Sequence, residues 1–417
     1  MQLQRVVVTG LGALTPIGNN FSLFWENLIA GTSGAAPITR FDTTKFKTKF
    51  ACEVKGFDPN DFFDRKEVRK MDAFTHYAVV VADEAIANAG LNPEKLNVDR
   101  VGVIWGSGIG GFGTLQEENA NFWTNDQNPR FSPFFIPKII SDIAPGWISI
   151  KHGFRGPNFT TVSACASSSN AIIDAMNYIR LGKADVIVTG GSEAPVVEAG
   201  VGGFNAMHAL STRNDDPSTA SRPFDKDRDG FVLGEGAGCM ILESLEHAKA
   251  RGAHIYAEVV GGGLSADAYH LTAPHPEGLG AQNVMRNALD DAGMSPSDID
   301  YVNVHGTSTQ LGDIAEVTAI KEVFGDHAYH LNISSTKSMT GHLLGAAGVI
   351  EAIASVMAVN DNIIPPTINH FTDDPNIDSK LNLTFNKAQK REVRAALSNT
   401  FGFGGHNASV IVKKFNA

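Results

Sequence analysis

The chain has 417 residues, of which 43% are hydrophobic and 19% are charged. This mixture excludes a disordered chain and leaves room for two domains of ordinary size. The 34 Lys and Arg residues and the 45 Asp and Glu residues give a net charge of −11, which excludes a protein that meets nucleic acid with its whole surface.

Short β-branched runs followed by small residues predict buried strands along the whole chain. These runs cover residues 5–9, 101–105, 185–189, 255–260, 301–304 and 409–412. Apolar residues at helical spacing predict helices over 76–89, 166–181 and 348–359. The last of these segments is almost entirely apolar, which is typical of a helix buried between layers. The alternation of strands and helices predicts an α/β protein.

Two strand-like segments with Gly-rich sequels resemble each other. One is VVVTGLGALTPIG, which begins at Val6, and the other is IYAEVVGGGLSADAYH, which begins at Ile255. We therefore predict two similar halves, residues 1–255 and residues 256–417. Residues 205–230 are rich in Asp, Ser, Arg and Pro and predict a long loop, because the apolar pattern resumes on both sides.

Targeting signals and disulfides are not expected. The first residues, MQLQRVVVTG, enter a strand-like run at once and lack the order of a signal peptide. No uninterrupted apolar stretch approaches the roughly 20 residues of a membrane span. Three widely spaced cysteines do not indicate a disulfide framework. We expect a cytoplasmic protein that does not interact with membranes.

Residues 106–111, GSGIGG, follow an apolar run and fit the G-x-G-x-x-G pattern of a dinucleotide-binding turn. That turn also needs an acidic residue about 20 positions later to hold the ribose. Pro129, Arg130 and Phe131 stand there instead. The sequence argues against a dinucleotide site, and a failure to bind NAD(P) would exclude it.

Cys165 lies in TTVSACASSSN, where an extended run meets a predicted helix. Unpaired N–H groups and the positive end of the helix dipole favour a thiolate there. Small neighbours leave room for a substrate, so we predict a nucleophile. Cys52 and Cys239 are predicted to be buried core cysteines.

Two histidines stand at the ends of predicted elements. His305 ends the run DYVNVH before a Gly/Thr loop, and His342 lies in STKSMTGHLLGAAG, just before the apolar helix. A lone histidine is more often a structural residue. Both of these histidines, however, lie in polar segments next to apolar elements, which is typical of residues that line a site. Lys337 and Glu351 flank His342, and a lysine beside an apolar helix needs a partner.

The segment SNTFGFGGHN leads into the last predicted strand. Glycines around Phe403 permit positive φ and could present N–H groups to an oxyanion. The alternative is a tight turn with an anchoring aromatic ring. No pair of histidines and cysteines has metal-ligand spacing, so we expect no metal.

Together these segments resemble the β-ketoacyl-[acyl-carrier-protein] synthases of the thiolase superfamily, and among them the elongating condensing enzymes of type II fatty acid synthesis. The resemblance covers nearly the whole chain and rests on VSACASS, VNVHGTST, STKSMTGHLLGAAG and NTFGFGGHN. It implies a thiolase-like five-layer α-β-α-β-α sandwich of two similar halves, a homodimer, and no cofactor.

The resemblance assigns a role to each motif. Cys165 accepts an acyl group from an acyl-carrier-protein thioester, and its own N–H and that of Phe403 form the oxyanion hole. His305 and His342 donate hydrogen bonds to the thioester oxygen of malonyl-carrier protein as CO₂ leaves, and the carbanion attacks the acyl-cysteine. By the resemblance, Lys337 with Glu351 orients the site and sets its charge, and Phe403 acts as a gate. Thr307 and Thr309 contact the pantetheine arm, and residues 267–272, which include Thr272, form a mobile loop beside it. Ile109 and Phe401 contact the substrate.

Close relatives differ from this pattern. A thiolase needs a second catalytic cysteine, and none follows Cys239, whereas initiating synthases pair one His with an Asn. Decarboxylative elongation by two carbons is therefore favoured. A ketosynthase of a polyketide or aryl-polyene pathway shares every catalytic residue and stays an alternative. A catalytically silent scaffold is compatible only with an unreactive Cys165.

The carrier protein is acidic, so a chain of net charge −11 needs a local basic cluster to bind it. By the resemblance, the docking residues are Arg65, Lys66, Arg69, Lys70 and Arg130. His208 stands where close relatives often carry a docking arginine. We expect weaker or more pH-dependent carrier binding as a result.

Overall fold

The strands of the described residues, 3–416, form one ten-stranded sheet and two two-stranded ribbons in this computed structural model. In order across the large sheet, the strands are β10 (Asn332–Ser334), β9 (Tyr301–Asn303), β13 (Ala395–Gly402), β14 (His406–Lys413), β8 (Ala257–Ala266), β1 (Val6–Leu14), β7 (Gly236–Ser244), β6 (Val186–Glu193), β4 (Val101–Gly106) and β5 (Asn158–Thr161). The ribbons pair β2 (Ala36–Pro37) with β3 (Phe50–Ala51) and β11 (Ile363–Ile364) with β12 (Gln389–Lys390).

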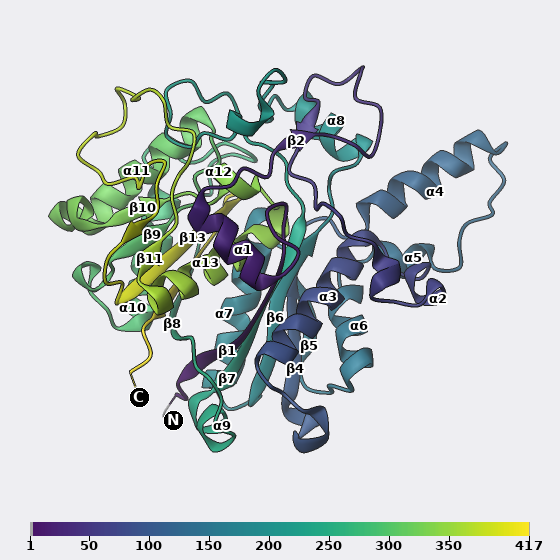
Figure 1. Cartoon of the computed structure of the whole chain (residues 1–417), viewed down its shortest axis with the longest axis horizontal. Coiled ribbons are helices and arrows are strands. Elements are labelled where there is room, and N and C mark those ends of the chain that lie inside the picture. Colours follow the sequence, from purple (N-terminus) through teal and green to yellow (C-terminus); the bar gives the residue numbers. More distant parts are fainter. Residues whose placement is uncertain (1–2, 417) are drawn as a thin grey trace.

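The helices of the described residues are α1 (Phe21–Ala30), α2 (Arg65–Val68), α3 (Ala73–Asn88), α4 (Phe112–Thr124), α5 (Phe135–Ile139), α6 (Ile143–His152), α7 (Ser167–Arg180), α8 (Glu198–Ala206), α9 (Leu245–Ala250), α10 (Leu279–Ala292), α11 (Gln310–Phe324), α12 (Lys337–Thr340) and α13 (Ala347–Asp361). Helices α3 and α6 cover the outer face of the β1 side of the sheet, and α10 and α11 cover that of the β8 side (Figure 1). Helices α7 and α13 pack between the two sides. The result is the predicted five-layer α-β-α-β-α sandwich.

The two sides of the large sheet have the same topology. Outward from the middle, one side runs β1-β7-β6-β4-β5 and the other β8-β14-β13-β9-β10. If the five strands of each side are numbered in chain order, both sides read 1-5-4-2-3 from the middle outward. The antiparallel pair β1 and β8 joins the sides. The two halves are therefore similar, as predicted, while a boundary at residues 255 and 256 stays a prediction.

The similarity between the Gly-rich segments of β1 and β8 has a packing cause. A Cβ on Gly12 would lie 2.1 Å from a backbone oxygen of α3, and a Cβ on Gly263 would lie 2.2 Å from a backbone oxygen of α10. Only glycine lets an outer helix approach a strand this closely. The first strand of each half therefore needs a glycine where the outer helix packs on it.

Helix α13 belongs to a long and mostly apolar segment of the chain. Within residues 3–416, Leu344–Asp361 is the one segment that is long and apolar enough to cross a membrane, but 89% of it is buried. It packs between the layers, against α7, β7 and β13. Glu351 and Ser355 interrupt this segment, so the prediction that no uninterrupted apolar stretch reaches this length holds. The prediction of a helix buried between layers is confirmed.

Each predicted strand and helix lies within or overlaps an observed element. Helix α3 begins three residues earlier than predicted, because Asp72 caps it by accepting a hydrogen bond from the backbone N–H of Phe74. The sequence analysis missed strands β5, β7, β10 and β13, and helices such as α10 and α11. The three cysteines are free and buried.

Candidate active site

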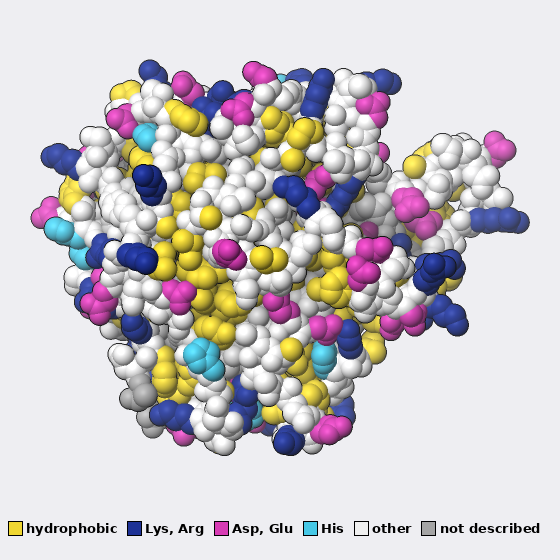
Figure 2. Space-filling model, in the orientation of Figure 1, with side chains coloured by type: hydrophobic (Ala, Val, Ile, Leu, Met, Phe, Trp, Pro, Cys, Tyr) yellow, Lys and Arg dark blue, Asp and Glu magenta, His cyan; other side chains and the backbone are white. Residues whose placement is uncertain are grey.

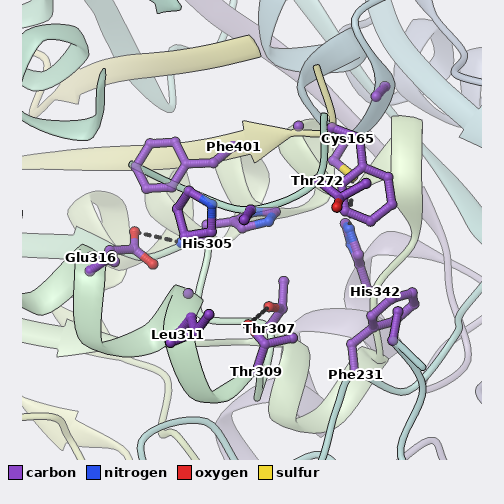
Figure 3. A pocket seen from close by; sticks show the side chains of 18 of the residues that line it. Cys165, Phe231, Thr272, His305, Thr307, Thr309, Leu311, Glu316, His342 and Phe401 are labelled. Atoms are coloured by element: carbon purple, nitrogen blue, oxygen red, sulfur yellow. Dashed lines mark hydrogen bonds between the residues drawn. The ribbon is translucent and has the colours of Figure 1, made fainter. Parts of the chain in front are cut away.

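The four motifs singled out in the sequence meet at one cavity of about 700 Å³ (Figure 3). Cys165, His305, His342 and Phe403 line it, together with residues from both halves of the chain. They come from segments that follow β5, β9, α12 and β13. These segments are far apart in the sequence, and the fold brings them together.

Cys165 lies in a single 3₁₀ turn, Ala164–Ala166, between β5 and α7. The preceding residue, Ala164, has a φ of 51°, a left-handed conformation that costs a non-glycine residue free energy. The cysteine is thus held at a strained join between a strand and a buried helix. Its side chain is 7% exposed, at the cavity wall.

Both predicted histidines lie beside the sulfur. Nε2 of His342 is 3.0 Å from Sγ of Cys165. The ring of His305 lies 5.3 Å from that of His342, centroid to centroid, and the two planes are nearly perpendicular at 87°. Burial, reinforced by the positive charge of Lys337, lowers the pKa of both rings well below the usual value for histidine. Both are therefore neutral at pH 7 and can each present one N–H.

The backbone N–H groups of Phe403 and Cys165 converge on the sulfur. Burial raises the pKa of the Cys165 thiol, and these two N–H groups oppose that effect. Phe403 occupies the turn between β13 and β14, and Gly404 and Gly405 have φ values of 85° and 75°. The GFGG segment is thus a tight turn that also presents an N–H to the site, so both sequence interpretations describe it.

Lys337 and Glu351 form a buried ion pair behind the cavity wall. Neither residue lines the cavity, but the charge of Lys337 lowers the pKa of Cys165, His305 and His342. It therefore favours a thiolate and neutral rings. Glu351 supplies the opposite charge without which a buried ammonium group would be strongly destabilising.

The protonation state of Cys165 differs from the sequence prediction. Burial raises the pKa of its thiol to about 12, and the opposing effects of Lys337 and the two N–H groups do not offset it. The prediction of a thiolate stabilised by the helix terminus is therefore wrong for the resting protein. Desolvation outweighs the dipole, because the sulfur lies inside the protein.

Glu316 was not predicted from the sequence, yet it supports His305. Its two carboxyl oxygens accept hydrogen bonds of 2.8 Å from the backbone N–H groups of His305 and Gly306 (Figure 3). Burial raises the pKa of Glu316 to about 7. A glutamate within an amphipathic helical pattern gives no sequence signal of this kind, because most such residues face solvent.

The GSGIGG segment does not form a dinucleotide site. The backbone N–H groups of Gly108 and Ile109, which would face a pyrophosphate, donate to the carboxylate of Glu193 at 2.8 and 3.1 Å. Anion-binding donors that are already occupied by a protein carboxylate are not free for phosphate. The structure supports the sequence argument against this interpretation and supplies its physical reason.

The five predicted substrate-contact residues line the same cavity, at different points of its wall. The hydroxyl oxygens of Thr307 and Thr309 are 3.1 Å apart, and the ring of Phe401 lies 5.7 Å from that of His305. Thr272 belongs to the segment that reaches the GFGG turn, where the carbonyl of Leu271 accepts a hydrogen bond of 2.7 Å from the N–H of Gly404. Ile109 lines the cavity next to Gly108.

The predicted docking residues lie outside the cavity. Figure 2 shows Lys and Arg side chains over α2 and on the loop that follows α4. Within residues 3–416, none of the five docking residues forms an ion pair. His208 lines the cavity and is exposed.

Comparisons with known proteins agree with this geometry. The family model of the β-ketoacyl synthase N-terminal domain matches residues 3–248, and that of the C-terminal domain matches residues 256–371. A 3-oxoacyl-[acyl-carrier-protein] synthase 2 of Staphylococcus aureus (strain COL) is 52% identical over 417 residues, which is 100% of both chains.

Two solved structures extend the comparison. A β-ketoacyl synthase from Burkholderia phymatum STM815 is 35% identical, with a TM-score of 0.92 over 99% of this chain and 100% of that one. The other structure is that of a type II polyketide synthase acyl-carrier protein in complex with its ketosynthase bound to the hexaketide. One chain of that structure is 33% identical to this chain, with a TM-score of 0.88 over 100% of both chains. The chain belongs to the β-ketoacyl synthase family.

Proposed function

We propose that the chain catalyses the decarboxylative Claisen condensation of malonyl-[acyl-carrier-protein] with an enzyme-bound acyl group. It lengthens fatty acyl chains by two carbons. The 52% identity over the full length to a 3-oxoacyl-[acyl-carrier-protein] synthase 2 supports this reaction. The structural observation that carries it is the convergence of His342 and two backbone N–H groups on the sulfur of Cys165.

The reaction has two half-reactions. In the first, Cys165 attacks the acyl thioester, a cysteine–acyl bond replaces the carrier–acyl bond, and the thiol proton ends on the released carrier thiol. In the second, the malonyl group loses CO₂, and the electron pair of the broken carbon–carbon bond forms an enolate that attacks the acyl-cysteine. The sulfur leaves with its electron pair and takes up a proton. No oxidant or reductant is consumed.

The side chains that surround the sulfur divide this work. We assign the stabilisation of the tetrahedral oxyanion to the N–H groups of Cys165 and Phe403, which lie near enough to the sulfur to lower the pKa of its thiol against the larger effect of burial. His305 and His342 donate hydrogen bonds to the malonyl thioester oxygen as the enolate forms. His342 also lies where it can relay the thiol proton. Lys337 keeps both rings neutral.

The function is tested with the purified chain, acyl-carrier proteins of graded chain length and malonyl-carrier protein. We expect one CO₂ for each 3-oxoacyl product, measured by radiolabel release and by mass spectrometry of the carrier. The absence of condensation with every chain length would contradict the proposal. A product that is extended repeatedly before release would instead favour the polyketide alternative, to which one structural neighbour belongs.

We infer that the substrates arrive on an acyl carrier protein that docks on Arg65, Lys66, Arg69, Lys70 and Arg130. A structural neighbour is a ketosynthase in complex with such a carrier. Cationic side chains without intramolecular ion pairs are suited to an acidic partner on a protein that is otherwise acidic.

Reversing the charge of two docking residues, Arg65→Glu with Arg69→Glu, is expected to raise KM for acyl-carrier protein about tenfold while kcat changes little. The matched control is Lys249→Glu on α9, which lies at the bottom of the view and away from α2 (Figure 1). Steady-state kinetics at low and moderate salt measure the effect. Equal KM values for both variants would place the carrier elsewhere.

We infer that two copies of the chain form a homodimer through the β5 edge of the sheet. Strand β5 is the last strand on its side, and Val162 directly after it is 62% exposed. Trp123 on α4 and Ile136 on α5 are 65% and 58% exposed, and Figure 1 shows α4 projecting from the body of the molecule. A second copy pairing along β5 would extend the sheet and cover these side chains.

Sedimentation velocity is expected to give twice the chain mass. Trp123→Asp combined with Ile136→Asp is expected to shift the protein toward monomer. A wild-type protein that sediments as a monomer at micromolar concentration would contradict the homodimer. Location in the cytoplasm stays a prediction from the sequence.

A further inference from the structure

Glu193, the last residue of β6, is a buried carboxylate to which the sequence analysis gave no role. Its side chain is 1% exposed and lines the cavity that holds Cys165. Oε1 accepts hydrogen bonds from Oγ of Ser107 at 3.0 Å and from the N–H of Ile109 at 3.1 Å. Oε2 accepts from the N–H of Gly108 at 2.8 Å and of Gly345 at 2.9 Å.

The hydrogen bonds require the ionised form of Glu193. Each oxygen already accepts two hydrogens, and a protonated carboxyl group would need an acceptor for its own O–H. Burial raises the pKa of Glu193, and the four donors oppose this effect. The donor set therefore accommodates a carboxylate, whose bonds to N–H groups are charge-assisted.

The two loops that Glu193 joins lie on different parts of the site. One loop carries Ile109, which lines the cavity. The other begins at His342 and passes through Leu344, whose φ of 47° is strained for a non-glycine residue. A Cβ on Gly345 would lie 2.5 Å from the backbone nitrogen of Gly108, so the loops are in direct contact. One carboxylate holds both.

We propose that Glu193 is a positioning residue that fixes the Ile109 loop to the His342 segment, so that the shape of the acyl-binding wall and the geometry at Cys165 are set together. This inference rests on the proposed condensation reaction. It predicts that the side chain influences both the chain-length preference and the reactivity of the sulfur, although it touches neither substrate carbon nor proton in the reaction.

The negative charge of Glu193 also reaches the sulfur. It raises the pKa of Cys165, whereas Lys337 and the N–H groups of Phe403 and Cys165 lower it. The other titratable groups at the sulfur are His342, in direct contact, and His305, next to His342. Removal of the Glu193 charge leaves Lys337 as the nearby ion that acts on the thiol, so the thiolate becomes easier to form.

The first test is alkylation of Cys165 by iodoacetamide across a pH series in Glu193→Gln. Only the thiolate reacts, so the rate below the thiol pKa follows the thiolate fraction. We expect alkylation to be about tenfold faster than in the wild type at the same pH, because an adjacent negative charge is gone. A residue that is merely structural would leave this pH profile in place.

The second test is the ratio of kcat/KM for a long-chain and a short-chain acyl-carrier protein. The glutamine offers one accepting oxygen instead of two, so part of the link between the loops is lost. We expect the ratio to change about tenfold, as pocket contacts of this size typically do. Ser107→Ala removes one donor on the Ile109 side and keeps the charge. It is expected to change the ratio in the same direction without altering the alkylation profile.

Glu84→Gln is the matched control. Glu84 is a partly buried carboxylate that, like Glu193, accepts hydrogen bonds from backbone N–H groups, here those of Ala13 and Phe21, but it lies outside the cavity. We expect it to leave both measurements unchanged. Circular dichroism and thermal unfolding establish that each variant is folded.

The outcomes separate this inference from the proposed function. A folded Glu193→Gln with wild-type alkylation and a wild-type chain-length ratio overturns the role of Glu193. If that variant does not fold, an unchanged ratio in Ser107→Ala overturns it. A wild-type protein that does not condense any acyl-carrier protein overturns the proposed function, whereas the alkylation series still tests the charge effect of Glu193.

Discussion

Replacing Cys165 with alanine is expected to abolish condensation, with a loss of kcat of about 10⁵-fold or more, as is typical when a covalent nucleophile is removed. Among the residues that line the cavity, Cys165 is the one thiol, and only a thiol can form the acyl thioester that the enolate attacks. Intact-protein mass spectrometry with acyl-carrier protein is expected to show no acyl adduct.

Cys239→Ala is the control for this variant. Cys239 lies in β7 and packs in the core beneath α3, away from the cavity, and it is also buried and free. This variant is expected to retain acyl transfer. Acyl transfer by Cys165→Ala at more than a trace rate would show that the nucleophile is another residue.

The second large effect is expected for His305→Ala and His342→Ala. Each variant removes one N–H from the oxyanion that forms as CO₂ leaves, and the loss of one such donor costs about 10²- to 10³-fold in rate. We therefore expect malonyl decarboxylation to fall more than acylation in both variants. His342→Ala should slow acylation more than His305→Ala does, because His342 contacts the sulfur.

Two separate assays measure these half-reactions: CO₂ release from malonyl-carrier protein without an acyl acceptor, and the rate of acyl-adduct formation at Cys165. His330→Ala, at an exposed position away from the cavity, is the control. Equal losses in both half-reactions for both cavity variants would show that the roles of the histidines have been assigned incorrectly.

The candidate site illustrates which side chains leave a local signal. Cys165, His305 and His342 stand where a strand or loop meets a helix, among small and polar residues, so their positions stood out in the sequence. Glu316 and Glu193 stabilise the same site but give no such signal. Their function depends on backbone N–H groups contributed by other segments, and nothing in the adjacent sequence identifies those donors.

The protonation state of Cys165 also depends on both local sequence and tertiary structure. The sequence correctly placed the cysteine before a helix, and that position predicts a lowered pKa. The structure adds burial, which raises the pKa to about 12 and outweighs the opposing effects of Lys337 and of the backbone N–H groups of Phe403 and Cys165. Burial is the sum of contacts from many segments, so local sequence does not determine it.

The sequence by itself determined the α/β class, the similar Gly-rich segments at the first strand of each half, and the family motifs. These follow from local patterns, namely the periodicity of the side chains and the conformational freedom of glycine. Only the tertiary structure decided that GSGIGG holds Glu193 rather than a nucleotide, and that burial raises the pKa of the Cys165 thiol. Both depend on which distant group fills the space beside a segment, and this is set by the packing of the whole chain.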